Sequence, residues 1–330
     1  MFKLSKILFM NSLILGTLIS VSAYSWFSMW MGLEINLLSF IPLLMKEKNM
    51  ISSEMTLKYF IIQALASMIL IFSMITLLSF NYYNLNYSLN LILNSSFLTK
   101  MGAAPFHFWF TEIIEGMNWL NSMILLTWQK IAPLILLMYS MKMMMFFIYI
   151  IIVSMIISSI LGLNQTSLRK ILAFSSINHL GWMISLILTN QNSWILYFII
   201  YSFITLNITF LFFNFNIYFF QQLNLLMKTN KMIKLSFFLN FLSLGGLPPF
   251  LGFFPKWLTI NSLIENNLFM LSLIMIIFTL LTLFYYLRLM FNSLLIFSIE
   301  NLNLNYPSNL ILNINFINIL SLIFCTFFFN

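Results

Sequence analysis

Long apolar segments separated by short polar ones recur along the whole chain. Most approach the roughly 20 residues that an α-helix needs to cross the hydrocarbon core of a membrane. We predict eleven such spans, at residues 4–22, 25–45, 57–79, 88–105, 119–140, 143–162, 171–189, 194–215, 235–262, 268–288 and 310–329. The connecting segments, such as NYYNLNYS at 81–88, are short and rich in Asn, which leaves no room for a soluble domain between them.

The first span has a second interpretation, as a cleaved signal peptide. Lys3 and Lys6 lie at its start and the small residues of SAYS follow it, as in a secretory signal. The many spans that come after it favour a membrane helix instead.

The composition supports a helical membrane protein and excludes a water-soluble one. Of 330 residues, 62% are hydrophobic and only 7% are charged, too few to solvate the surface of a soluble domain. A transmembrane β-barrel would need short segments of alternating polarity, whereas this chain has long apolar runs. We therefore predict an all-α polytopic protein whose residues 1–330 form a single membrane domain.

The lysines and arginines of the connections fall almost entirely on one side of the predicted membrane. With eleven spans, that side holds the N-terminus and these eleven residues: Lys3, Lys6, Lys46, Lys48, Lys58, Arg169, Lys170, Lys228, Lys231, Lys234 and Arg288. The other side holds only Lys142. Such asymmetry is what the positive-inside rule describes for short loops. It also accounts for the net charge of +8 without a nucleic-acid partner.

A few ionisable residues remain inside the predicted spans, namely Glu34, Lys100, Lys130, Lys256 and His179. A charge at the centre of a membrane helix costs about 2.5–3.5 kcal/mol on insertion scales, so four of them cost about 10 kcal/mol. None of the four charged residues has an opposite charge three or four positions away on its own helix. Their partners are therefore expected on other helices or in internal water.

One buried acid faces three buried lysines, so Glu34 can neutralise at most one of them. Loss of hydration favours the neutral form of a buried amine, and an amine that alternates between charged and neutral carries protons. The alternative is snorkelling of the side chain to the membrane surface. Snorkelling suits Lys58, which opens its span, better than Lys130, which lies well inside its span.

Glycine and proline interrupt two of the predicted helices. Pro105 lies in KMGAAPF within the fourth span, and the ninth span contains GGLPPFLGFFPK, with its break residues Gly245, Gly246, Pro248 and Pro249. Proline removes a backbone donor, and the carbonyls that it frees are tolerated in a membrane only where they face protein or water. Paired breaks of this kind are typical of transporters built from repeats, although a packing kink is the alternative for either break alone.

Several polar residues near these features have two interpretations each. His179 either hydrogen-bonds a neighbouring helix or relays protons. His107, beside the first break, lies either at an access route or at the membrane surface. We interpret Glu112 and Glu115 as charges on a connection after the first break, and the alternative is that they line an access route. Aromatic and Met-rich stretches such as MKMMMFFIYII are expected to face lipid or to serve packing.

The residues also argue against a bound cofactor or metal in this chain. Cys325 is the only cysteine, and the chain has no aspartate and no glycine-rich phosphate loop. Haem and iron–sulfur clusters therefore lack an adequate set of ligands.

Six stretches carry a resemblance to a known family: MGLEINLLSFIPLL, LKYFIIQALAS, KMGAAPFHFWF, LLTWQKIAP, NQTSLRKILAFSSINHLGWM and LGGLPPFLGFFPKW. They resemble the antiporter-like membrane subunits of respiratory complex I, in particular subunit 2 of NADH dehydrogenase. The matching motifs follow one another closely between Gly32 and Trp257. It implies an antiporter-like fold with two discontinuous helices, shortened at the N-terminus to eleven helices as in animal mitochondria.

The resemblance also implies roles for residues of this chain. Glu34 would tune the protonation of Lys100, Lys130 would pass protons along the middle of the membrane, and Lys256 would gate the far half-channel. The family often has proline where this chain has Thr111, which puts only the local helix start in doubt.

The resemblance further implies a location and partners. The chain would lie in the mitochondrial inner membrane with its N-terminus in the matrix, among the other membrane-arm subunits of complex I and phospholipids, cardiolipin included. NADH, FMN, iron–sulfur clusters and ubiquinone would bind to other subunits.

Two other functions remain open. One is a stand-alone cation/proton antiporter, for which one buried acid supplies a poor cation site, and the other is a scaffold whose charges only hold helices together.

Overall fold

In this computed structural model, the described residues are 4–45, 50–79, 86–227 and 231–295. They form α-helices joined by short connections, with no named strand among them. The helices are α1 (Leu4–Ser22), α2 (Trp26–Leu44), α3 (Met50–Ser79), α4 (Asn86–Met101), α5 (Phe108–Gly116), α6 (Trp119–Leu126), α7 (Trp128–Tyr139), α8 (Met144–Leu163), α9 (Leu168–Thr189), α10 (Ser193–Phe215), α11 (Phe220–Met227), α12 (Lys231–Gly245), α13 (Phe253–Glu265) and α14 (Phe269–Leu295).

Within the described residues, eight helical segments are long and apolar enough to cross a membrane, α6 and α7 together counting as one. This confirms the predicted all-α polytopic architecture. The number of eleven spans stays a prediction, because the span expected at 310–329 lies outside the described residues.

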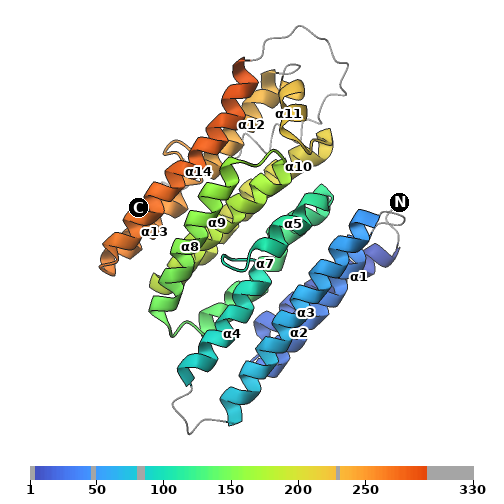
Figure 1. Ribbon diagram of the computed structural model, residues 1–330, viewed down its shortest axis with the longest axis vertical. Helices are drawn as coiled ribbons and strands as arrows, with labels where there is room; N and C mark the ends of the chain where they lie inside the picture. The colour runs from blue at the N-terminus through green and yellow to red at the C-terminus, as the bar shows by residue number, and fades with distance from the viewer. Residues whose placement is uncertain (1–3, 46–49, 80–85, 228–230, 296–330) are drawn as a thin grey trace. The chain divides into compact units, whose positions relative to one another are not determined.

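The chain divides into two compact units, residues 1–150 and 151–330, and the division falls within α8. We call them the first and second units and describe each by itself. In the first unit α2 packs between α1 and α3 (Figure 1). The two glycines Gly16 and Gly32 bring the α1 and α2 backbones together, since a Cβ on Gly32 would lie 2.6 Å from the amide nitrogen of Ser20. Small residues allow such close helix contacts in membranes.

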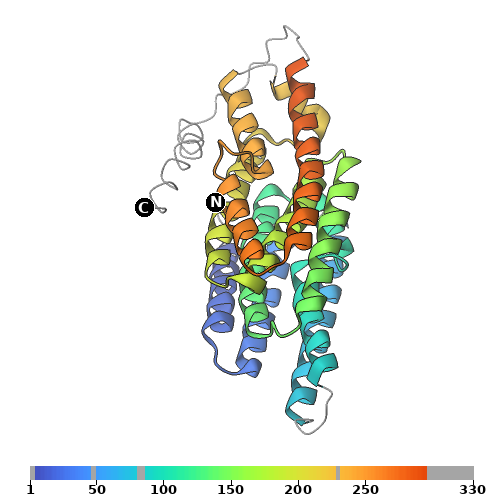
Figure 2. The same ribbon diagram turned by 90° about the vertical axis from the view of Figure 1, so that its left-hand side faces the viewer.

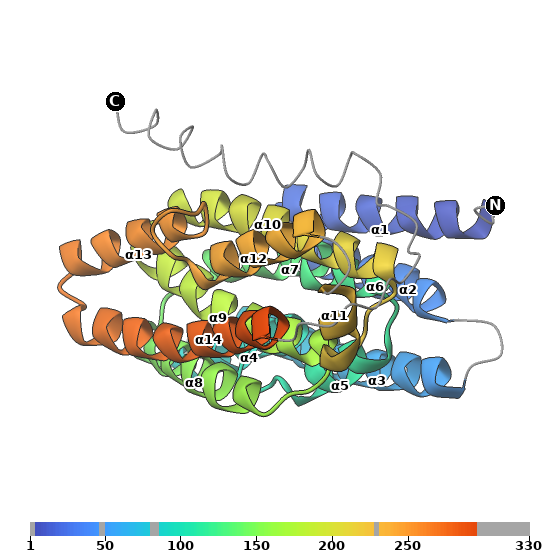
Figure 3. The ribbon, with the colours of Figure 1, turned by 90° about the horizontal axis from the view of Figure 1, so that it is seen from above.

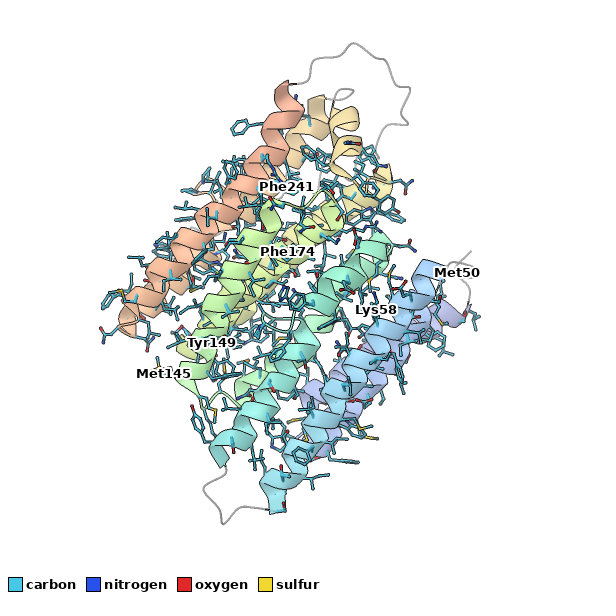
Figure 4. The ribbon with its side chains drawn as sticks, viewed as in Figure 1. Met50, Lys58, Met145, Tyr149, Phe174 and Phe241 are labelled. Carbon is cyan, nitrogen blue, oxygen red and sulfur yellow. The ribbon has the colours of Figure 1, made fainter. Side chains whose placement is uncertain are left out.

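In the second unit α9 is the central helix. In the apolar part of α9 that is long enough to cross a membrane, 94% of the residues are buried, far more than in the other candidate spans. Helices α10, α13 and α14 pack against it, and α14 also runs beside α12 (Figure 2). Phe174 on α9 and Phe241 on α12 are both buried in this unit (Figure 4). In the part of α8 that belongs to the first unit, Met145 and Tyr149 of the Met-rich stretch project outward and are 77% and 60% exposed, which is compatible with the expected lipid-facing or packing surface (Figure 4).

The first predicted break separates α4 from α5. α4 ends at Met101, and Gly102 adopts the left-handed conformation with φ +72°. The amide of Gly102 donates to the carbonyl of Thr99, and that of Ala103 donates to the carbonyl of Leu98. These two bonds form a Schellman motif, which satisfies carbonyls that a helix end leaves free.

The second break separates α12 from α13 and has the same form. α12 ends at Gly245, and Gly246 has φ +75°. The amides of Gly246 and Leu247 donate to the carbonyls of Ser243 and Leu242, a second Schellman motif. Pro248 and Pro249 follow in the non-helical segment before α13 begins at Phe253 (Figure 3).

Three features of the helices differ from the prediction. Residues 108–116 form α5 rather than a connection, so Glu112 and Glu115 lie on a short helix. The fifth span is interrupted at Thr127, whose hydroxyl donates to the carbonyl of Met123 and competes with the regular helix pattern there. The short helix α11 lies where no element was expected.

Candidate functional site

The first unit brings Glu34 and Lys100 together from α2 and α4. The Nζ atom of Lys100 lies 3.9 Å from Oε1 of Glu34, and their side chains are 4% and 25% exposed. Oε1 is buried and has no hydrogen-bond partner among the described residues. The pair is therefore close enough for strong electrostatic interaction but is not locked by a direct hydrogen bond.

The end of α4 supplies further stabilisation around Lys100. Lysine in the last turn of a helix interacts favourably with the negative end of the helix dipole. Nε1 of Trp109 donates to the carbonyl of Thr99 at 3.0 Å, and Nε2 of Gln63 donates to the carbonyl of Lys100 at 3.3 Å. Gln63 thus satisfies a carbonyl at the helix end, as a membrane interior requires, and Trp109 adds a second bond to the carbonyl that Gly102 already uses.

Lys130 lies in the first turn of α7 and is only 1% exposed. Its Nζ lies 5.2 Å from the centre of the Phe110 ring, within the range of a cation–π interaction. Next to it in the chain, Nε2 of Gln129 donates to Oδ1 of Asn36 on α2 at 2.9 Å. This hydrogen bond ties the helix of Lys130 to the helix of Glu34.

In the second unit, Lys256 on α13 points to the end of α12. Its Nζ donates to the carbonyl of Gly245 at 2.9 Å and lies 6.0 Å from the centre of the Trp182 ring. The lysine is 7% exposed. Helix carboxyl ends carry partial negative charge, so the second break itself provides the electrostatic partner that α13 lacks.

The two histidines differ in their surroundings. Nδ1 of His179, in the middle of α9, lies 2.8 Å from the hydroxyl of Tyr197, and the ring lies beside Tyr201 with centroids 5.0 Å apart. His107 is 1% exposed and lies within the first break, where Nδ1 is 3.2 Å from the carbonyl of Pro105. The structure thus gives His179 the neighbouring-helix hydrogen bond that we considered, and a role of either histidine in proton transfer stays a prediction.

Lys58 and the acids of α5 lie outside this set. Lys58 is 43% exposed at the side chain and pairs with Glu54 and Glu112, at 3.0 and 3.1 Å. Figure 4 shows Lys58 on α3. Exposed ion pairs contribute little to stability, so we interpret these charges as part of a solvated surface.

Sequence reasoning missed the side chains that hold the surroundings of the charges in place: Gln63 and Trp109 donate to backbone carbonyls, and Gln129 donates to the side chain of Asn36. Polar side chains inside apolar runs are the signal that could have found them, and Gln63 in FIIQALAS is such a residue. Among the described residues, no three His, Cys, Asp or Glu side chains gather as a metal site requires.

The family model described as "NADH:quinone oxidoreductase/Mrp antiporter, TM" matches residues 23–282. Curated proteins named NADH-ubiquinone oxidoreductase chain 2 are similar over most of their length. The protein of Anopheles gambiae is 50% identical over 93% of this chain and 89% of its own, and that of Aedes aegypti is 48% identical over 98% of both.

Solved structures share the fold at lower sequence identity. A chain of respiratory complex I from Thermus thermophilus with bound aureothin has a TM-score of 0.86 at 20% identity, over 97% of this chain and 79% of that one. A chain of the Mrp complex from Dietzia sp. has a TM-score of 0.77 at 15% identity, over 90% and 61%. With identities this high to the curated proteins along nearly its full length, the chain belongs to the NADH-ubiquinone oxidoreductase chain 2 family.

Proposed function

We propose that this chain is a proton-translocating core membrane subunit of mitochondrial NADH:ubiquinone oxidoreductase, and that Glu34, Lys100, Lys130 and Lys256 carry the protons. Membership of the family supports assembly of the chain into NADH:ubiquinone oxidoreductase, and the buried charges support proton translocation. The redox cofactors NADH, FMN, iron–sulfur clusters and ubiquinone would be bound by other subunits. The single membrane domain that we predict over residues 1–330 would hold all four residues.

The observation that carries this proposal is the Glu34–Lys100 pair. At an effective dielectric constant of 20, two unit charges about 4 Å apart interact by about 4 kcal/mol. This corresponds to roughly a thousandfold change in an equilibrium constant, because each 1.4 kcal/mol is about a factor of ten. Protonation of Glu34 would remove that attraction, so Lys100 would release its proton far more readily.

The weak direct contact in the pair suits this role. A carboxylate locked to an ammonium by short hydrogen bonds would hold its charge state, whereas Oε1 of Glu34 lies 3.9 Å away and has no hydrogen bond among the described residues. A change of charge at Glu34 therefore need not break a tight ion pair first.

Lys130 and Lys256 are proposed to respond to their surroundings in the same electrostatic manner. The Phe110 ring and the carbonyl of Gly245 are uncharged, so they favour the ammonium form less strongly than a carboxylate would. Both lysines are buried, and burial favours the neutral amine. Their protonation is thus open to control by charges elsewhere in the assembly.

The location follows from the same proposal. The chain would lie in the mitochondrial inner membrane with its N-terminus in the matrix, as the family resemblance implies, and the positive-inside asymmetry of its connections supports this orientation. Its apolar outer surfaces, which include Met145 and Tyr149, would contact other membrane-arm subunits and phospholipids, cardiolipin among them.

Similarity of fold to the Mrp complex keeps a stand-alone cation/proton antiporter as the second candidate. Such a protein needs an oxygen-rich cation site. Glu34 has an ammonium rather than a second carboxylate as its charged neighbour in the first unit, which favours proton transfer over cation binding.

Substitution of Glu34 by Gln in the assembled complex tests the proposal. The amide keeps the shape of the side chain and removes its charge, so we expect fewer protons pumped per NADH oxidised, with the complex still assembled. Proton uptake and NADH oxidation measured together in sealed membrane vesicles give this ratio. Glu112→Gln, at an exposed carboxylate, is the matched control and should pump normally. Normal pumping by Glu34→Gln would refute the proposal.

A further inference from the structure

A pocket of about 480 Å³ lies at the end of the second unit where α8 ends and α9 begins. A volume of this size is in the range of small-molecule sites, which measure about 300–1,000 Å³. Its lining mixes polar and apolar side chains from two connections and from α14, and it consists of Asn164, Gln165, Thr166, Phe220, Arg288 and Leu289.

The walls of this pocket are held in place by contacts between segments far apart in the sequence. The amide of Phe220, at the start of α11, donates to the carbonyl of Thr166 on the connection between α8 and α9 at 3.2 Å. α14 packs closely against the end of α8, because a Cβ on Gly162 would lie 2.9 Å from the ring of Tyr285. The chain therefore forms the pocket by itself.

Arg288 brings an unused positive charge to this pocket. Its side chain is half-buried, and it makes no hydrogen bond or ion pair with another described residue. Arg169, by contrast, lies over the Tyr218 ring, 4.7 Å from its centre. A guanidinium presents five donors in a planar fork that matches the oxygens of a phosphate group. The exposed side chains of Asn164 and Thr166 can add an amide and a hydroxyl donor.

The charges around the pocket favour an anion. Besides Arg288, Lys170 lies at this end of the second unit, in the first turn of α9. In the described part of this unit the only acid is Glu265, at the end of α13. The hydroxyl of Ser262, also near the end of α13, lies 3.0 Å from that of Thr189 at the opposite end of α9. Since α9 has 22 residues, the acid lies about 30 Å away along this helix.

The pocket also lies at the depth where a membrane meets water. The apolar span of α8 ends at Leu163 and that of α9 begins at Leu168, so the polar residues of the pocket lie just outside both spans. Arg288 lies in the last turn of the apolar span of α14. Phe220 and Leu289 add apolar contact beside these polar groups. A phospholipid carries its phosphate at this depth, directly above apolar chains.

We propose that this pocket binds the headgroup of an anionic phospholipid, with the phosphate on Arg288 and the glycerol end of the acyl chains against Phe220 and Leu289. Basic pockets between membrane helices bind anionic lipid headgroups. The inference uses the membrane architecture of the chain and not the proton path, so it can fail while the proposed function stands.

A photoactivatable phosphatidylglycerol tests the site in the assembled complex. The complex is placed in phosphatidylcholine vesicles that contain this lipid, with its reactive group near the glycerol, and mass spectrometry of the digested chain locates the label. We expect label in residues 160–167 and 285–291. Arg288→Gln should reduce this label at least about tenfold, the loss expected when hydrogen bonds to a charged group are removed. Arg288→Lys keeps the charge but not the fork, so it should reduce the label less.

Lys170→Gln is the matched control. It removes a positive charge from the same end of the second unit, and Lys170 does not line the pocket, so the label should persist. Equal labelling of Arg288→Gln and Lys170→Gln would overturn the inference. Loss of the label from the unmodified complex in excess inorganic phosphate, at constant ionic strength, would show that the pocket takes a soluble phosphate and would also overturn it.

A density map of the unmodified complex, purified without inorganic phosphate, gives a readout that needs no variant. Density for a phosphate beside Arg288 that continues into an acyl chain supports the inference. An empty pocket, or one filled by a segment of another subunit, contradicts it.

Discussion

The three buried lysines meet three different kinds of neighbour. Lys100 faces a carboxylate, Lys130 faces an aromatic ring, and Lys256 faces the carbonyl at a helix end. A carboxylate attracts an ammonium more strongly than a ring or a single carbonyl does, because it carries a full charge. Of these three contacts, the one between Lys100 and Glu34 is therefore the strongest.

The substitution Lys130→Met tests the role of one of these buried charges. Methionine is close to lysine in length, and replacing a buried charge by an apolar group removes an insertion cost of about 2.5–3.5 kcal/mol. Assembly should therefore be preserved while proton pumping per NADH falls. The measurement is the proton-to-NADH ratio, alongside the amount of assembled complex on a native gel.

Lys142→Met is the control, because Lys142 is exposed on the connection before α8. It removes the same charge from the surface and should leave the ratio unchanged. If Lys130→Met pumps like the control, the buried charges serve only as a scaffold.

The charged residues themselves were predictable, whereas their partners were not. A lysine or glutamate inside an apolar run is visible in the sequence, so Glu34, Lys100, Lys130 and Lys256 could all be named. The distance between Glu34 and Lys100 depends on how α2 and α4 pack, which no local pattern encodes. The partner of Lys256 is a backbone carbonyl. Every residue has one, so the residue types in the sequence do not show which carbonyl the lysine binds.

The two broken helices end in the same way. α4 and α12 each finish with a Schellman motif around a left-handed glycine, Gly102 or Gly246. Each helix end then has a buried lysine near it, Lys100 within α4 and Lys256 across the break. The same construction, a helix end with a buried lysine near it, therefore occurs once in each unit.

The glycines of the second break allow a sharp comparison. Gly246→Ala would place a side chain at φ +75°, 2.8 Å from Cδ and 2.9 Å from Nζ of Lys256. The left-handed conformation costs a non-glycine residue about 1–2 kcal/mol, and the contact adds to that cost. We expect a less heat-stable complex with reduced pumping.

Gly245→Ala, one residue earlier, is the matched variant. A Cβ there would lie 3.6 Å or more from its neighbours, which is ordinary contact. Alanine also suits a helical position better than glycine does. Thermal inactivation of both variants checks the pair, and equal stability would show that the left-handed turn at Gly246 is dispensable.

The positions of the breaks followed from glycine and proline, but the irregular helices around them did not. α5 is too short to cross a membrane, so hydropathy gives it no signal. The interruption at Thr127 coincides with a threonine hydroxyl bonded to its own helix, but Thr205 and Thr209 make the same kind of bond in α10 without a break, so the bond alone does not predict one.

The whole chain reads as a membrane protein because its apolar runs approach the thickness of a bilayer. That property requires no tertiary information, so the all-α membrane architecture was predictable, although the short helices α5 and α11 were not. The division into two compact units was not predicted, because no polar linker or change of composition marks it. The single membrane domain over residues 1–330 stays a prediction.

The orientation of the chain in the membrane can be tested by labelling cysteines on either side of α8. Lys142 precedes α8 and Asn164 follows it, so the two residues should lie on opposite sides. In a chain whose only cysteine, Cys325, is replaced by Ser, we expect Asn164→Cys to react with a membrane-impermeant maleimide from the matrix side and Lys142→Cys from the other. Both positions are exposed, so burial does not prevent the reaction.

Labelling of both cysteines from one side would mean that α8 does not span the membrane. Labelling of each from the side opposite to the expected one would invert the orientation derived from the positive charges.

The left-handed glycines at the two breaks also have a genetic consequence. Every substitution in the first or second base of a glycine codon replaces it by a residue that carries a Cβ, or by a stop. A Cβ at Gly102 would lie 2.8 Å from the Phe110 side chain, and one at Gly246 would meet Lys256. Inherited missense changes at these two codons should therefore appear as respiratory defects.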